Sequence, residues 1–205
     1  PKVDITYTRG KPDPCLGCTK GKMGRRRRKT YRIHRAKEKL ESTHSDVIGP
    51  FKTGVFGYKY IVTFLDEATR KGKIYFMKKK NEVLSKFQEY KANVENECKS
   101  KISNLKISNN IRDKLLRLQS DGGGEYNSCE FIQYLASEGI THHCTNADEP
   151  RQNGMSERYG RSLQETALSM LKHAKLSTRY WPYAFRSASH VLNCLPAGHL
   201  GGRSP

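Results

Sequence analysis

Two acidic residues of this 205-residue chain close β-rich stretches, and a third opens a segment with helical spacing. Asp46 and Asp121 are the two that end strand-like segments, and Glu157 stands near the start of the helical one. Asp46 and Asp121 lie 75 positions apart, and 35 residues separate Asp121 from Glu157. Any fold of this chain must therefore bring two strand ends and one helix start together if the three carboxylates form a single site.

Three carboxylates that meet at one point cannot all stay ionised without a counter-charge. Divalent cations supply that charge, and hard oxygen ligands suit Mg²⁺ or Mn²⁺. Sites of this kind typically carry out phosphoryl transfer on nucleic acid. The three acidic residues therefore indicate a metal-dependent enzyme acting on a polynucleotide.

Each acidic residue also has a simpler interpretation when it is taken alone. An aspartate at the end of a strand, such as Asp46, often serves a turn. Asp121 precedes three glycines, which is a common turn signal. Glu157 near a helix start favours the helix dipole. Only the three together, in this order and spacing, favour a catalytic site over these interpretations.

The periodicity of apolar residues predicts the order strand, strand, strand, helix, strand, helix, strand, helix, helix. This mixed pattern is typical of an α/β protein. Strands are expected at residues 40–47, 58–65, 72–77, 115–120 and 140–144. Helices are expected at residues 81–99, 128–137, from about 155 onward, and 178–195.

The helix that carries Glu157 is predicted to be amphipathic. Glu157 lies two residues from Met155, about 200° around the helix, and so faces away from the apolar stripe. Arg161, four residues on, shares its polar face and is suited to a phosphate. Gly160 costs this helix about 1 kcal/mol relative to alanine. The predicted inward stripe consists of Met155, Tyr159, Leu163, Ala167, Met170 and Ala174.

Three segments carry a resemblance to a known family. They are residues 44–50 (HSDVIGP), 121–126 (DGGGEY) and 152–158 (QNGMSER). In this order and spacing they resemble the integrase catalytic core of copia-type LTR retrotransposons, in the retroviral integrase superfamily. The resemblance implies an RNase H-like fold with a mixed five-stranded sheet flanked by helices, over residues 40–205. Met155 and Gly160 depart from the family's pattern.

The resemblance also implies a function, namely joining of element DNA ends to target DNA. Asp46, Asp121 and Glu157 would hold two Mg²⁺ or Mn²⁺ ions, with water attacking in end trimming and a DNA 3′-hydroxyl in strand transfer. Glu125 is interpreted as a structural or solvated carboxylate. A homo-oligomer in the nucleus and in a cytoplasmic virus-like particle is expected.

Candidate DNA contacts are Asn153, Arg158, Arg161, Lys172 and Lys175, although a surface loop or a solvated basic face explains them as well.

The first 39 residues are predicted to form a basic arm. The first 40 residues carry 14 of the 38 Lys and Arg but 3 of the 20 Asp and Glu. A polyanionic partner, above all nucleic acid, is the favoured explanation, against a solubilising tail or a nuclear-localisation signal. No apolar run approaches the roughly 20 residues that cross a bilayer. The densest basic run consists of Arg25, Arg26, Arg27 and Arg28.

Cys15 and Cys18 have the spacing of half a tetrahedral zinc site. They resemble the closing half of the His-His-Cys-Cys module that precedes integrase cores, whose histidines would lie upstream of Pro1. Zinc binding is expected only if those ligands are present. Two other functions stay open for the whole chain, a non-catalytic or domesticated DNA-binding domain and an RNase H-type nuclease.

Overall fold

The computed structural model describes residues 35–105, 114–145, 154–196 and 200–205. They belong to one compact unit that begins at Arg35. The division into a basic arm and a catalytic core stays a prediction, because residues 1–34 lie outside the described residues. The predicted site residues that also lie outside them are Cys15, Cys18, Arg25, Arg26, Arg27, Arg28 and Asn153.

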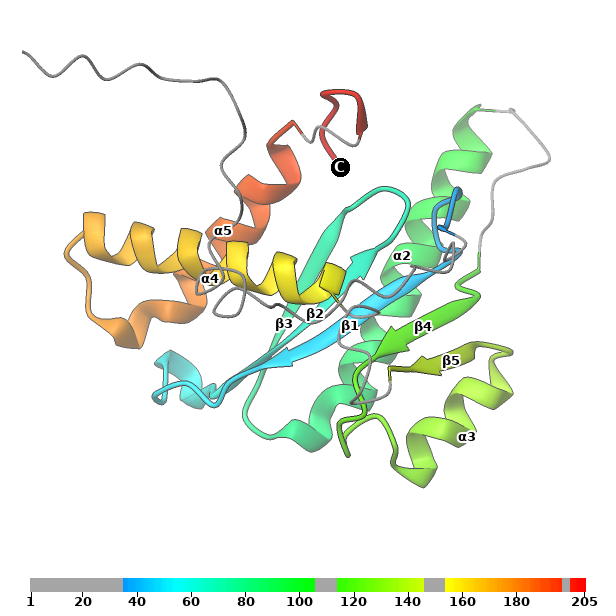
Figure 1. Ribbon diagram of the computed structural model, residues 1–205, viewed down its shortest axis with the longest axis horizontal. Helices are drawn as coiled ribbons and strands as arrows, with labels where there is room; N and C mark the ends of the chain where they lie inside the picture. Colours follow the sequence, from blue (N-terminus) through cyan, green and yellow to red (C-terminus); the bar gives the residue numbers. More distant parts are fainter. Residues whose placement is uncertain (1–34, 106–113, 146–153, 197–199) are drawn as a thin grey trace, which may run out of the picture. The chain divides into compact units, whose positions relative to one another are not determined.

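A mixed five-stranded sheet with the order β3-β2-β1-β4-β5 forms the centre of this unit (Figure 1). The first three strands pair antiparallel, whereas β4 and β5 run parallel to β1. All five strands lie within three residues of their predicted bounds. The strands are β1 (Thr43–Ile48), β2 (Tyr60–Asp66), β3 (Gly72–Met77), β4 (Arg117–Ser120) and β5 (Thr141–Cys144).

The four predicted helices are also present. The first continues to Leu105, six residues beyond its predicted end. Among the described residues, no helix combines the length and the apolarity that a transmembrane segment requires. The α-helices are α2 (Val83–Leu105), α3 (Cys129–Ser137), α4 (Gly154–His173) and α5 (Trp181–Cys194), and the short 3-10 helices are η1 (Val55–Gly57), η2 (Lys80–Glu82) and η4 (Thr178–Tyr180).

The core consists of two apolar clusters, one on each face of the sheet, and β2 contributes side chains to both. Val62 and Phe64 belong to the cluster formed with α2 and α3, whereas Ile61 belongs to the cluster formed with α4 and α5. This division follows from the strand period of two, which sends neighbouring side chains to opposite faces. The sheet is therefore covered by helices on both faces, α2 and α3 on one and α4 and α5 on the other (Figure 1).

Aromatic rings dominate the cluster beneath α2. Phe64 stacks on Tyr90 with ring centroids 4.6 Å apart, and Phe87 contacts both Phe64 and Phe131 at 5.8 and 5.5 Å. Large rings bury much apolar area, and offset or tilted contacts suit their quadrupoles. Ile132 of α3 is 49% exposed and does not belong to this cluster, although it is the neighbour of the buried Phe131.

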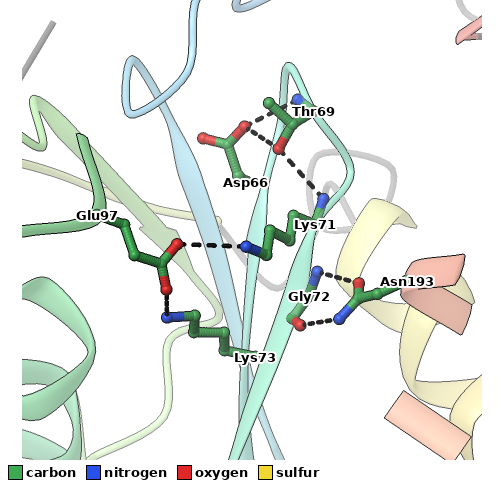
Figure 2. A network of polar contacts seen from close by, with 7 residues as sticks. All are labelled: Asp66, Thr69, Lys71, Gly72, Lys73, Glu97 and Asn193. Atoms are coloured by element: carbon green, nitrogen blue, oxygen red, sulfur yellow. Dashed lines mark hydrogen bonds and ion pairs between the residues drawn. The ribbon is translucent and has the colours of Figure 1, made fainter. Parts of the chain in front are cut away.

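The hairpin of β2 and β3 is tied to its surroundings by polar contacts (Figure 2). Asn193 of α5 accepts from the Gly72 amide at 2.9 Å and donates to the Gly72 carbonyl at 2.7 Å. Because β3 is an edge strand, these two backbone groups have no partner strand on their outer side. A side chain at position 72 is excluded, since its Cβ would lie 2.2 Å from the Tyr159 hydroxyl.

Substitution of Asn193 by alanine is expected to lower the free energy of unfolding by about 1–3 kcal/mol, because both backbone groups of Gly72 lose their partner. Urea unfolding measures this change. Asn93→Ala is the matched control, since that amide lies exposed on α2 and makes one long contact to Tyr75. Equal effects of the two substitutions would contradict the proposed role of Asn193.

Candidate active site

The pairing of β1 with β4 brings two of the predicted carboxylates together. The two strands run parallel, with Thr43 opposite Leu118 and His44 opposite Gln119. Each of these pairs is separated by 75 positions, which is also the separation of Asp46 and Asp121. Extending the register therefore aligns the two aspartates on neighbouring strands, which lie about 4.8 Å apart in a sheet.

Glu157 approaches the same place from another layer. It lies in the first turn of α4, and it lines a cleft of about 450 Å³ together with Asp46. The cleft continues along α4 past Arg161. Asp121 therefore lies beside Asp46 on the neighbouring strand. Glu157 approaches Asp46 from the helix that covers this face of the sheet.

The face that α4 turns towards the sheet differs in part from the predicted stripe. Tyr159 and Met170 are half-buried and pack against the apolar cluster formed with α5, as predicted. Met155 is half-buried, and the prediction is wrong at Ala174, which is exposed. Small residues explain the difference, because they let the helix backbone approach the sheet closely. The buried residues of α4 are Ser156, Gly160, Leu163, Ala167 and Leu171.

Gly160 lies where α4 packs closely against β1. A Cβ atom there would lie 3.2 Å from Ile48 Cδ1 and 3.8 Å from Asp46 Oδ2. The glycine that looked unfavourable for the helix thus allows α4 to cross directly over the strand that carries Asp46. It also helps to place Glu157, three residues earlier, at the mouth of the cleft.

The electrostatic environment of Asp46 opposes its ionisation. Burial is the largest cause that raises the pKa of Asp46, and the negative charge of Asp121 follows. Glu157 and Glu125 raise the same pKa further, and a hydrogen bond from the Val47 amide opposes them. A cluster of this kind gains from a bound cation, which would remove the mutual repulsion of the carboxylates.

Glu125 is a fourth carboxylate at the site. Its side chain is 9% exposed, and Lys80 Nζ lies 3.2 Å from its Oε1. A Cβ on Gly123 would lie 2.9 Å from the Glu125 carboxyl carbon and 3.1 Å from Asp121 Oδ1. The carboxylates of Glu125 and Asp121 therefore flank one glycine. The sequence did not predict the ion pair of Glu125, because its partner Lys80 lies 45 positions earlier in the chain.

Two hydrogen bonds fix the strands that carry the aspartates. Ser45 Oγ lies 2.6 Å from the hydroxyl of the fully buried Tyr126, which joins β1 to the loop after β4. Ser120 Oγ lies 2.9 Å from His142 Nε2 of β5. Burial, and then the charge of His143, lower the pKa of His142. His142 is half-buried and His143 exposed, as strand alternation predicts.

Carboxylates suit a divalent cation by their chemistry, and Asp46 and Glu157 line the same cleft. Among residues 35–105, 114–145, 154–196 and 200–205, no three His, Cys, Asp or Glu side chains converge closely enough to hold an ion. Asp46, Asp121 and Glu157 are thus assembled as neighbours without closing on a single point. The four cysteines in this part of the chain are free thiols, with Cys98 buried.

The predicted basic contacts on α4 occupy different places. Arg161 lines the cleft beside Glu157, whereas Arg158 folds back so that its guanidinium lies near Gly154. Lys172 and Lys175 are exposed at the far end of the helix. Sequence reasoning missed Leu168, which lines the same cleft and is largely exposed.

Comparison with known proteins places these features in context. No protein-family model matches the chain. The chain is 37% identical over 203 residues to the retrovirus-related Pol polyprotein from transposon TNT 1-94 of Nicotiana tabacum, which covers 98% of this chain and 14% of that polyprotein. It is 35% identical over 166 residues to the polyprotein from transposon RE2 of Arabidopsis thaliana, covering 81% of this chain and 10% of that one.

Solved structures show the same fold. A chain of the simian T-cell lymphotropic virus intasome superposes with a TM-score of 0.61 at 17% identity, covering 87% of this chain and 57% of that one. The HTLV-2 integrase catalytic core domain in complex with magnesium gives 0.58 at 18% identity, covering 82% and 94%. The predicted RNase H-like fold is therefore confirmed.

The predicted resemblance is confirmed as well. The relatives are retrovirus-related Pol polyproteins from copia-like transposons, and the structural neighbours are retroviral integrase cores. The chain spans only 14% and 10% of the length of the first two relatives.

Replacing Asp46 by asparagine is expected to raise the free energy of unfolding at pH 7 in EDTA. The pKa of Asp46 is raised in the folded chain above its ordinary 3.8, so the ionised carboxylate costs stability at neutral pH. That cost falls as the pH drops through the folded pKa towards 3.8. The difference between variant and wild type should therefore be largest at pH 7 and fade in acid, as urea unfolding would show.

Glu130→Gln is the control for this measurement. Glu130 is exposed in the first turn of α3, so its neutralisation should lower the unfolding free energy, by about 0.3–1 kcal/mol, which is opposite in sign to the change expected for Asp46→Asn. A destabilised Asp46→Asn variant at pH 7 would show that the carboxylate cluster carries no repulsion.

Proposed function

We propose that this chain, homologous to a segment of copia-like Pol polyproteins, is an integrase catalytic core that joins retrotransposon DNA ends to target DNA. The observation that carries the proposal is the shared 75-residue offset of the β1–β4 register and of Asp46 and Asp121. That offset supports a side-by-side arrangement of the two carboxylates, and Glu157 of α4 lines the same cleft as Asp46. Such an arrangement suits metal-dependent phosphoryl transfer.

Asp46, Asp121 and Glu157 would hold Mg²⁺ or Mn²⁺ in this proposal. The HTLV-2 neighbour is described as a complex with magnesium, which supports the choice of a hard cation. Bound divalent ions would activate the attacking oxygen and stabilise the leaving one. Asp46 is half-buried and repelled by its neighbouring carboxylates, so such ions would favour its ionisation most.

The remaining groups of the cleft would handle the DNA backbone. Arg161 stands beside Glu157 and offers a planar donor set to a phosphate. Gly124 has open space around it, so a DNA strand can approach the loop beside Asp121 closely. Lys172 and Lys175 would extend the contact towards the far end of α4. Water would attack in end trimming and a DNA 3′-hydroxyl in strand transfer.

Assembly and location belong to the same proposal. The two HTLV-2 core structures are described as trimeric and dimeric forms, and the simian virus chain comes from an intasome. We propose that this chain likewise acts as an oligomer on DNA, in the nucleus and in a cytoplasmic virus-like particle. Zinc binding by Cys15 and Cys18 stays a prediction that depends on upstream ligands.

A joining assay with oligonucleotides ending in the element's terminal sequence tests the activity, and a branched substrate tests the reverse reaction. Activity should require Mg²⁺ or Mn²⁺ and disappear in EDTA. Glu157→Gln should lower it more than about 100-fold, since even groups that only support metal ligands are worth about 10–100-fold. Glu165→Gln is the matched control, because it lines the same cleft without being a proposed ligand.

The outcomes separate the competing functions. Joining or its reversal that depends on metal and on Glu157, but not on Glu165, supports the integrase. Metal-dependent cutting without either reaction would favour an RNase H-type nuclease. A folded protein that binds DNA but shows no reaction would favour the non-catalytic domain.

A further inference from the structure

Phe56 combines two unfavourable features at a surface position. Its side chain is 67% exposed, and its backbone lies in the left-handed region with φ 65° and ψ 8°. A bulky residue rarely adopts this conformation, which glycine or asparagine would adopt at lower cost. Strain and exposure of a large ring at one residue point to a role outside folding.

Other aromatic side chains gather around Phe56. Its ring lies 6.2 Å from both Tyr58 and Tyr183, and Tyr180 lies 6.5 Å from Tyr183. Tyr183 is 52% exposed and Tyr180 44%. We call these four residues, Phe56, Tyr58, Tyr180 and Tyr183, the aromatic patch. It joins η1 with the start of α5, and none of its members lines the cleft beside Asp46.

The aromatic patch rests on a firm base. Tyr58 contacts Phe76, which in turn contacts the buried Trp181, with ring centroids 5.5 and 5.7 Å apart. The Trp181 indole N–H donates to the Lys52 carbonyl at 2.9 Å. Hydrogen bonds also close the turn, since the Gly54 amide donates to the Tyr58 carbonyl at 2.9 Å. These contacts therefore hold the exposed rings in fixed positions.

The surroundings of the aromatic patch are positively charged. Residues 49–60 and 175–187 contain no aspartate or glutamate. Gly57 lies close to the Lys78 side chain, and Tyr183 precedes Arg186 by three residues on α5, which places them on one face. In the part of the chain that the structure describes, no carboxylate forms an ion pair with the neighbouring cations, which are Lys52, Lys59, Lys78, Arg179 and Arg186.

We infer that the aromatic patch is a stacking platform for the unpaired bases of single-stranded nucleic acid, whose phosphates contact the surrounding cations. Exposed rings bordered by unpaired cations are the two elements of such platforms. A nucleic acid strand supplies an anion and a flat ring at every nucleotide, which matches both. Bases of a duplex are already stacked, so the patch should prefer single strands over duplex.

The test replaces Phe56 by glycine. Glycine suits the left-handed backbone, so the variant should unfold at the same or a higher urea concentration than the wild type. Its affinity for a fluorescein-labelled oligothymidylate of about 16 nucleotides, in EDTA, should fall about 5- to 100-fold, the value of one stacked base. Affinity for a duplex of the same length should stay within about twofold, because paired bases do not stack on the patch.

Two further variants sharpen the assay. Ile132→Ala removes another half-exposed apolar side chain, on α3, and should leave single-strand affinity unchanged. Arg179→Ala should reduce the slope of log affinity against log salt by about 0.7, the value of one phosphate contact on a single strand. Phe56→Gly should leave that slope unchanged, because stacking releases no counterions.

Three results would overturn the inference. The first is an unchanged single-strand affinity of Phe56→Gly. The second is an equal loss on single strand and duplex. The third is a change in sedimentation mass with unchanged binding, which would identify the patch as a contact between copies of this chain. The measurements use EDTA and need no catalysis, so their result is independent of the joining assay.

Discussion

The parallel pairing of β1 and β4 is the contact on which the rest of the site depends. It aligns Asp46 with Asp121 on neighbouring strands, and both strands are held from outside the pair. On one side, β2 pairs with β1 along its whole length, and on the other β5 continues the parallel register. Ser45 and Tyr126 add a buried hydrogen bond across the same junction. Asp46 and Asp121 therefore lie close together because pairing on both sides fixes the two strands that carry them.

This arrangement concentrates charge where folding alone would avoid it. Asp46 is partly buried among three other carboxylates, and burial and repulsion both raise its pKa. Proteins tolerate such sites when a ligand compensates the repulsion, and stability is then lower in the absence of that ligand. The two apolar clusters on either face of the sheet supply the stability that offsets this cost.

Much of this architecture follows from local sequence. The β-rich apolar run of residues 60–66 and the helical spacing of Val83, Phe87 and Tyr90 identify their elements without any tertiary knowledge. The inward face of α4 followed only in part, because hydrophobicity does not mark the buried Ser156 and Gly160, and Gly160 packs against Ile48. The positions of Glu125 and Asn193 also escaped prediction, since each depends on a partner far away in the sequence.

The contact of Asn193 with Gly72 bears on how the chain folds during synthesis. It joins residues 121 positions apart, so it can form only after nearly the whole described unit has left the ribosome. The hairpin of β2 and β3 emerges before α5, and until then the outer edge of β3 is open to pairing with another strand. Until α5 docks, this edge is the point at which a nascent or truncated chain can pair with a neighbour. Docking of α5 thus covers the Gly72 backbone groups on this edge and protects it from pairing with other chains.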